Sequence, residues 1–180
     1  MALNLLEVKS HFLLNWQKIQ ERVNSLVKDD FELSRREMIE QSGFEVLQGE
    51  AKFLDEHTLE INGKKHRGEK IIIATGSKVF VPSITGLKET GYITSDEALV
   101  LKALPKSLIV IGGGFIAIEL GQMFSSLGVE VTILQRSERI LMRVDKDISL
   151  ELEKLMTGNS GNNIKIITET NILKIRKEAS

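Results

Sequence analysis

Apolar residues in the first part of the chain follow a helical period. From Leu3 to about Lys28 they recur mostly every three or four positions, which predicts an amphipathic helix that packs onto a sheet. The segment from Phe31 to Gln41 predicts a second helix, which ends at Gly43. Two helices are therefore expected before the first strand.

Shorter apolar runs that are typical of strands come next. Phe44 to Leu54 predicts one strand, or two strands that are broken at Gly49. Thr58 to Ile61 alternates polar and apolar residues and leads into Asn62-Gly63, the strongest short signal for a β-hairpin. Ile71 to Gly76 predicts a buried strand that ends in a turn of small residues. Together these runs predict an antiparallel meander that leads back into a parallel sheet.

A strand, a helix and a second strand follow in the C-terminal part. Leu108 to Ile111 is rich in β-branched residues and predicts a parallel strand that is buried on both faces. The helix after it is expected to end at Leu127-Gly128, where glycine can adopt the left-handed conformation. Val129 to Leu134 predicts the next buried strand.

The remaining segments complete an α/β pattern. Residues 78–104 are irregular, with a short helix from Ser95 to Leu99, and a domain boundary is placed between residues 1–104 and 105–180. Further elements are expected towards the C-terminus: a helix capped by Asp145 or Asp147, and strands at Ile164–Ile167 and Ile172–Ile175. The pattern predicts a three-layered, doubly wound, Rossmann-like unit that is incomplete at its C-terminus.

The turn between the first parallel strand and its helix carries the clearest chemical signal. Gly112 to Ala117 reads Gly-Gly-Gly-Phe-Ile-Ala and matches the dinucleotide motif G-x-G-x-x-G/A. Gly112 permits a tight turn, Gly114 lets the backbone approach a pyrophosphate, and Ala117 lets the helix pack close to the strand. The helix N-terminus adds free N–H groups and a positive dipole. A packing turn that binds nothing is the alternative, but the flanking strands favour a dinucleotide site.

The residues after the second strand bear on which dinucleotide binds. NAD-binding units usually have a carboxylate there for the ribose hydroxyls, whereas this chain has the neutral Gln135. Arg136 can donate two hydrogen bonds to a phosphate, and Ser137 can add a hydroxyl group. The pattern therefore favours NADPH over NADH. In the alternative reading, Arg136 and Arg139 are solvated surface charges, and Glu138 weakens a phosphate pocket.

The composition limits the other classes of function. The chain has 180 residues and a net charge of −1, which gives no reason to expect nucleic acid or an anionic membrane as a partner. It has neither a membrane-spanning apolar run nor a signal peptide, so we expect a cytoplasmic protein. It has no cysteine, which excludes disulfides and a cysteine nucleophile within this sequence, and its three histidines lie far apart, so no metal site is predicted.

Four short motifs occur in order along most of the chain. They are Gly49-Glu50-Ala51-Lys52-Phe53, Ile71 to Gly76 with its final Ala-Thr-Gly, Pro82-Ser-Ile-Thr-Gly86, and residues 104–121 around the glycine turn. The ordered set resembles the class I pyridine nucleotide-disulfide oxidoreductases, the flavoprotein family of mercuric reductase, dihydrolipoamide dehydrogenase and glutathione reductase. The resemblance implies that residues 1–104 are part of an FAD-binding domain and that residues 105–180 are an NAD(P)-binding domain.

The resemblance also implies roles for single residues. Phe115 falls where many members have a tyrosine that gates the nicotinamide pocket, and Glu119 matches a glutamate near the nicotinamide. Arg136 matches an arginine that grips the 2′-phosphate, while a second such arginine is replaced by Met142. The expected NAD(P)H contacts are Gly112, Gly114, Phe115, Ile116, Ala117, Glu119, Gln135, Arg136 and Ser137. The expected FAD-edge contacts are Glu50, Ala51, Thr75 and Gly76.

In this family, hydride passes from NADPH to the flavin, and electrons then pass to a disulfide or a metal ion. The sequence lacks the family's first FAD-binding unit, its pair of redox cysteines and its dimerisation domain. It therefore resembles the middle of a reductase that mainly supplies the NAD(P) unit, with weak or no FAD binding, no catalytic residue and no turnover of its own.

Two further readings stay open on the sequence. The chain could be a dinucleotide-binding module, alone or as half of a split enzyme whose second chain supplies the flavin and cysteine parts, or it could be a remnant that binds nothing. In each case Ile71–Ile73 and Ile164–Ile167 should lie in incomplete sheets and expose apolar surface. We therefore expect self-association.

Overall fold

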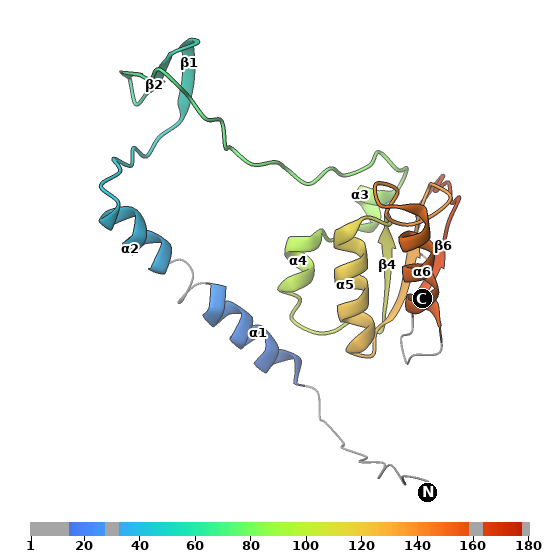
Figure 1. Cartoon of the computed structure of the whole chain (residues 1–180). Coiled ribbons are helices and arrows are strands. Elements are labelled where there is room, and N and C mark those ends of the chain that lie inside the picture. Colours follow the sequence, from blue (N-terminus) through green and yellow to red (C-terminus); the bar gives the residue numbers. More distant parts are fainter. Residues whose placement is uncertain (1–14, 28–32, 159–163, 178–180) are drawn as a thin grey trace, which may run out of the picture. The chain divides into compact units, whose positions relative to one another are not determined.

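The computed structural model describes residues 15–27, 33–158 and 164–177 (Figure 1). The chain divides into two units. One unit is residues 22–81, and the other is residues 82–180 together with the segment before Arg22. Each unit is described by itself. The domain boundary predicted between residues 104 and 105 stays a prediction. None of the described helices has both the length and the apolarity that a membrane crossing needs.

Residues 22–81 are built around a small antiparallel sheet in the order β1-β2-β3. Its strands are β1 (Ala51–Asp55), β2 (Thr58–Ile61) and β3 (Lys64–Arg67). The predicted hairpin at Asn62-Gly63 is confirmed: both residues have positive φ, 52° and 74°, as a two-residue turn between twisted strands requires. The strand predicted from Phe44 is wrong in its first half, because β1 begins only at Ala51.

Two helices precede this sheet in sequence. They are α1 (Trp16–Asn24) and α2 (Leu33–Gln41), and α2 ends before Gly43, which has a φ of 73°. The part of the first predicted helix before residue 15 lies outside the described residues. In its described part, this helix reaches the core beside the parallel sheet through Trp16. The Trp16 ring lies 6.2 Å from the ring of Phe124, and its indole N–H donates to the Leu101 carbonyl at 2.6 Å.

The strand predicted from Ile71 to Gly76 is wrong. The segment has no regular structure, and the side chains of Ile72 and Ile73 are 90% and 69% exposed. An apolar run becomes a strand only when another strand satisfies its N–H and C=O groups, and no described strand pairs with this one. The expectation of exposed apolar surface is met here, but not at Ile164, which is only 6% exposed.

The other unit contains a parallel sheet in the order β4-β5-β6. Its strands are β4 (Ser107–Ile111), β5 (Glu130–Leu134) and β6 (Ile164–Ile167), connected by the helices α5 (Phe115–Ser126) and α6 (Lys146–Thr157) (Figure 1). Phe124 of α5 and Met156 of α6 share one apolar core with Val131 and Ile133 of β5. Both helices therefore pack on the face of the sheet that carries Val131 and Ile133.

The opposite face of this sheet is open among the described residues. Ile109 and Ile111 of β4 are 66% and 41% exposed, while Leu108 and Val110 face the core. The prediction that β4 is buried on both faces is therefore wrong, because a continuous apolar run does not reveal whether a second helix layer is present. The described residues form two layers, and the three-layered arrangement stays a prediction.

The segment between the two sheets contains α3 (Leu87–Thr90) and the predicted short helix α4 (Ser95–Leu99). Gly86, which precedes α3, has a φ of 82°, and a Cβ there would collide with the carbonyl oxygen of Ile175. The strand predicted at Ile172–Ile175 is present only as a single parallel bridge between Thr85 and Lys174. The prediction of a strand is therefore wrong apart from this bridge, because no described strand pairs with residues 172–175.

The N-terminus of α4 carries a pH-sensitive cap. The Glu97 carboxylate accepts hydrogen bonds from the backbone N–H of Thr94 at 2.7 Å and from its hydroxyl group. The Thr94 hydroxyl and N–H lower the pKa of Glu97 below its usual value of 4.5. The stabilisation by this cap is therefore complete above pH 4.5 and is lost as the pH falls through the lower folded-state pKa.

We expect an NMR titration of the Thr94 amide to report this cap. Its chemical shift should change with a midpoint below pH 4.5 in the natural chain. In Glu97→Gln, which keeps an acceptor oxygen but cannot ionise, the same signal should not titrate. A midpoint at or above the ordinary glutamate value would contradict the cap.

Candidate functional site

The candidate site lies at the carboxyl end of the parallel sheet, where ligands of α/β sheets usually bind. The glycine turn connects β4 to α5, and Gln135 follows the end of the neighbouring strand β5. The Gly112 N–H donates to the Leu134 carbonyl at 2.8 Å, which ties the turn to the end of β5. Gly112 has a φ of 103°, a conformation that favours glycine, so its predicted role in a tight turn fits the geometry.

Gly113 is a requirement that the sequence motif does not reveal. A Cβ at this position would lie 2.9 Å from Cγ2 of Ile140 and 3.3 Å from Cβ of Gln135, so no side chain fits. The motif leaves this position unrestricted, and the only signal in the sequence is that Gly113 is the middle one of three consecutive glycines. A glycine is therefore needed at position 113 so that the turn can pack closely against Ile140 and Gln135.

Gly114 faces open space instead. A Cβ there would meet no atom within 4 Å, and the backbone is extended, with a φ of −84°. No side chain caps the N-terminus of α5 at this glycine, and the next residues, Phe115 and Ile116, are 59% and 60% exposed. The uncapped N–H groups at this end of α5 form an accessible surface that suits an anion.

The close approach of α5 to the sheet depends on two small residues. Ala117 is buried, as the motif predicts. Gly121, one turn further on, was not singled out from the sequence. A Cβ at Gly121 would lie 3.3 Å from Cδ1 of Ile133, so this glycine sets the spacing between α5 and β5. Glu119 lies on the exposed side of the same helix.

The three predicted residues after β5 differ in what they do. The Gln135 side chain is engaged within the protein: its Oε1 accepts from the Gly113 N–H at 3.0 Å, and its Nε2 donates to the Arg139 carbonyl at 3.2 Å. Arg136 is exposed, and its side chain has no hydrogen bond or ion pair with any described residue. Ser137 is half-buried beside it.

Arg139 is not the solvated surface charge that one reading of the sequence allowed. Its side chain is only 11% exposed, and its guanidinium group donates hydrogen bonds to three backbone carbonyls of the following turn. The sequence gives no sign of this role, because the acceptors are backbone atoms that only the fold brings into range.

The predicted FAD-edge residues lie in the unit of residues 22–81. Glu50 precedes β1, and Ala51 is its first residue, paired with Ile61 of β2. Thr75 and Gly76 are exposed and lie outside any helix or strand, and Gly76 has a φ of 72°. These four residues are therefore placed in two separate segments of that unit.

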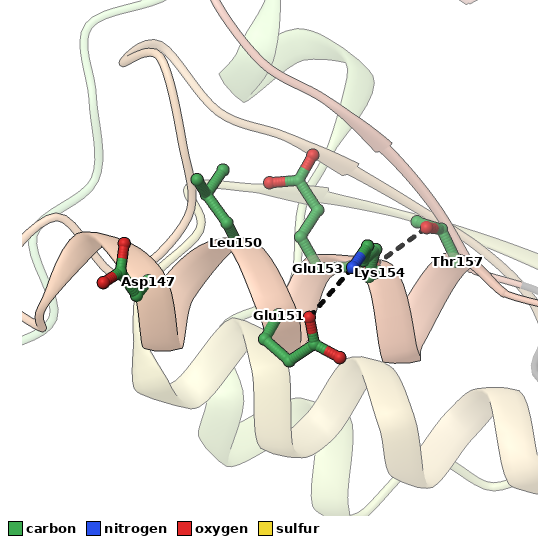
Figure 2. Close-up of a pocket in the computed structure, with 6 residues that line it drawn as sticks. All are labelled: Asp147, Leu150, Glu151, Glu153, Lys154 and Thr157. Carbon is green, nitrogen blue, oxygen red and sulfur yellow. Dashed lines mark hydrogen bonds and ion pairs between the residues drawn. The ribbon is translucent and has the colours of Figure 1, made fainter.

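A hollow of the surface lies along α6, away from the glycine turn (Figure 2). Its lining comes from this one helix: Asp147, Leu150, Glu151, Glu153, Lys154 and Thr157. Lys154 is paired with Glu151 at 3.1 Å, and the Thr157 hydroxyl donates to the Glu153 carbonyl at 2.8 Å (Figure 2). The hollow thus offers no converging free groups. Among the described residues, no cluster of histidine, aspartate and glutamate could hold a metal ion.

Comparisons with known proteins agree on one family. Residues 3–180 match the family model described as pyridine nucleotide-disulphide oxidoreductase. A mercuric reductase of Staphylococcus aureus is 39% identical over 163 residues, which cover 91% of this chain and 30% of that protein. A dihydrolipoyl dehydrogenase of Mycoplasma pneumoniae is 34% identical over 173 residues, which cover 94% of this chain and 37% of that protein.

A solved structure gives the same result. The Cu(II) complex of the HOCl-induced flavoprotein disulfide reductase RclA from Escherichia coli matches with a TM-score of 0.77 and 29% identity. The match covers 92% of this chain and 38% of that one. The chain therefore spans about a third of the length of these relatives.

Proposed function

Because this chain belongs to the pyridine nucleotide-disulphide oxidoreductase family, we propose that it supplies the NAD(P)H-binding part of a flavin-dependent oxidoreductase. One observation carries the proposal: the turn of Gly112 to Ala117 lies at the carboxyl end of a parallel sheet, with the Cβ direction of Gly114 open to solvent. A backbone without a side chain at that point leaves room for a pyrophosphate.

The proposed dinucleotide lies across the start of α5. Its pyrophosphate would accept hydrogen bonds from the N–H groups at the start of α5, which no side chain caps. Phe115 is the first residue of α5 and is exposed, so its ring would be available to stack on the nicotinamide. In this proposal Ile116 and Ala117 line the turn, and Glu119 lies on the exposed side of α5 towards the nicotinamide end.

The nucleotide that we propose is NADPH. Arg136 is exposed at the end of β5 without a partner among the described residues, so its guanidinium can pair with a 2′-phosphate. Gln135 supports this choice, because it places no negative charge there and its amide already bonds to Gly113 and Arg139. Ser137 would add a hydroxyl group to the same phosphate.

The flavin side of the proposal rests on the family. Residues 1–104 would contribute the adenine edge of an FAD site through Glu50 and Ala51 and a second edge through Thr75 and Gly76. FAD, when bound in a complete enzyme, would accept hydride from the nicotinamide and pass electrons to a disulfide or a metal ion. The sequence contains no cysteine, so we propose no catalytic residue within it.

The test of the proposed nucleotide is calorimetry with NADPH and NADH. We expect both to bind to the natural chain, with NADPH tighter. Arg136→Ala should weaken NADPH about tenfold and leave NADH nearly unchanged, because one charge-assisted contact is worth about 1.5 kcal/mol. The control is Lys106→Ala, which removes an exposed positive charge at the opposite end of β4 and should change neither affinity. If neither NADPH nor NADH bound to the natural chain, the proposal would be refuted.

The visible spectrum of the purified chain tests the flavin side. A colourless sample is expected, because the chain carries only edges of the proposed FAD site. A flavin band that bleaches on addition of NADPH would instead show that this chain, or a second chain purified with it, completes a reductase. A colourless chain that binds NADPH would fit the nucleotide-binding module.

A further inference from the structure

The Arg139 side chain donates hydrogen bonds to the backbone of the turn that follows β5, residues 140–144. Nη1 of its guanidinium donates to the carbonyls of Leu141 and Val144, both at 3.1 Å, and Nη2 donates to that of Met142 at 3.2 Å. The charge is not strongly paired, since the nearest carboxylate oxygen, on Glu138, is 4.0 Å from Nε. The guanidinium therefore serves the backbone of this turn rather than a charged partner.

These hydrogen bonds stabilise a turn that contains an unfavourable backbone conformation. Leu141 has a φ of 46°, a left-handed conformation that residues other than glycine adopt at a cost. The Ile140 carbonyl accepts from the hydroxyl of Ser149, which is fully buried, at 2.7 Å. Arg139 and Ser149 thus donate side-chain hydrogen bonds to a segment that forms no helix or sheet. The Leu141 carbonyl also accepts from the Val144 N–H at 2.9 Å, whereas Arg139 supplies the hydrogen bonds to the Met142 and Val144 carbonyls.

The same turn is bonded to the glycine turn at two points. The Leu141 N–H donates to the Gly113 carbonyl at 2.8 Å. The Gln135 amide links the Gly113 N–H to the Arg139 carbonyl. The Gly113 carbonyl is therefore held by the turn to which the Arg139 side chain donates, and the Gly113 N–H is held by Gln135, which also bonds to the backbone of Arg139.

We propose that Arg139 is a positioning residue for the dinucleotide. Through the turn of residues 140–144 it fixes the carbonyl of the Gly113-Gly114 peptide, against which the pyrophosphate packs, while the Gln135 amide joins the Gly113 N–H to the Arg139 backbone. This inference rests on the proposed function. It assigns different roles to the two neighbouring arginines. Arg136 binds the 2′-phosphate, which only NADPH has. Arg139 instead positions the backbone that binds the pyrophosphate, which NADPH and NADH share. Loss of Arg139 therefore lowers the affinity for both nucleotides by the same factor.

The decisive comparison is Arg139→Lys against Arg143→Lys. Lysine keeps the charge but cannot reach three carbonyls in a fixed fork. We expect Arg139→Lys to raise the dissociation constants of NADPH and NADH by about tenfold each, because a small displacement of a binding backbone has a large effect. Arg143 lies in the same turn and is exposed, so its substitution should leave both constants unchanged.

An NMR measurement separates positioning from a general loss of stability. In Arg139→Lys without ligand, the amide signals of Gly113 and Gly114 should shift, while that of Gly128 at the far end of α5 should not. If the arginine variant fails to fold, Gln135→Met, which keeps the length of the side chain and removes both hydrogen bonds, must give the same equal loss of both nucleotides.

The outcomes are distinct. Weakening of NADPH alone by Arg139→Lys would make Arg139 a phosphate ligand and would overturn the proposal. Unchanged affinities, or unmoved Gly113 and Gly114 signals, would overturn it as well. If the natural chain bound neither nucleotide, the proposed function would fail, and the glycine signals would still decide whether Arg139 positions the turn.

Discussion

Gly114→Ala is expected to raise the dissociation constant for NADPH about 100-fold while changing the free energy of unfolding by less than about 0.5 kcal/mol. The new methyl group would point into open space, and the extended backbone at a φ of −84° suits alanine, so the fold should tolerate it. The same methyl group would stand where we propose that the pyrophosphate meets the backbone. The methyl group would keep the pyrophosphate away from the N–H groups at the start of α5 and so remove charge-assisted hydrogen bonds.

The matched control for this variant is the glycine before it. Gly113→Ala would place a methyl group 2.9 Å from Cγ2 of Ile140, which should destabilise the fold by about 1–3 kcal/mol through overpacking. Calorimetry with NADPH and denaturant unfolding monitored by circular dichroism measure the two effects on both variants. NADPH binding at natural strength by Gly114→Ala would mean that no pyrophosphate lies against this turn.

Phe124→Ala is expected to lower the free energy of unfolding by about 3–5 kcal/mol. The Phe124 side chain is 0% exposed and lies in the core that α5, α6 and the parallel sheet share. It is also the aromatic partner of Trp16, at a ring separation of 6.2 Å and an angle of 43°. Its removal leaves a cavity that these neighbours cannot fill.

Phe115→Ala provides the comparison within the same helix. Phe115 is 59% exposed, so its loss should cost less than about 1 kcal/mol, and alanine suits a helix better than phenylalanine. Urea unfolding followed by circular dichroism gives both values. Equal destabilisation by the two variants would contradict the core described above.

Elements that are determined by residues close together in the sequence could be predicted. The hairpin at Asn62-Gly63 follows from two residues that accept positive φ, and the end of α5 follows from Gly128, whose φ is 88°. The three strands β4, β5 and β6 follow from apolar runs spaced for parallel crossovers. Each signal lies within a few residues of the element that it predicts.

Features that depend on distant partners could not be predicted. Ile71 to Gly76 has the composition of a strand, but composition does not supply the strand that must pair with it. Ile109 has the same character as Val110, yet only one of them faces a helix layer. The sequence therefore shows which segments are apolar, but it does not show which strand or helix layer covers them.

The candidate site shows the same division. The glycines and the exposed Arg136 follow from a local motif. The roles of Gly113, Gly121 and Arg139 depend on Ile140, Ile133 and three carbonyls, which come together only after folding. No local pattern signals an arginine whose acceptors are backbone atoms of a turn with a left-handed leucine.

The contact of Trp16 with Leu101, within the unit that contains the parallel sheet, also gives the chain an intrinsic fluorescent probe. Trp16 is the only tryptophan in the sequence, and both its indole N–H and the amide of Gln20 donate to the Leu101 carbonyl at 2.6 Å. The tryptophan emission of the protein, excited at wavelengths that its one tyrosine does not absorb, therefore reports on this one contact. Undocking of α1 would expose the indole to water and move this emission to longer wavelength, while the circular dichroism of the sheet stays the same. Release of the first helix can therefore be followed separately from global unfolding without attaching a dye.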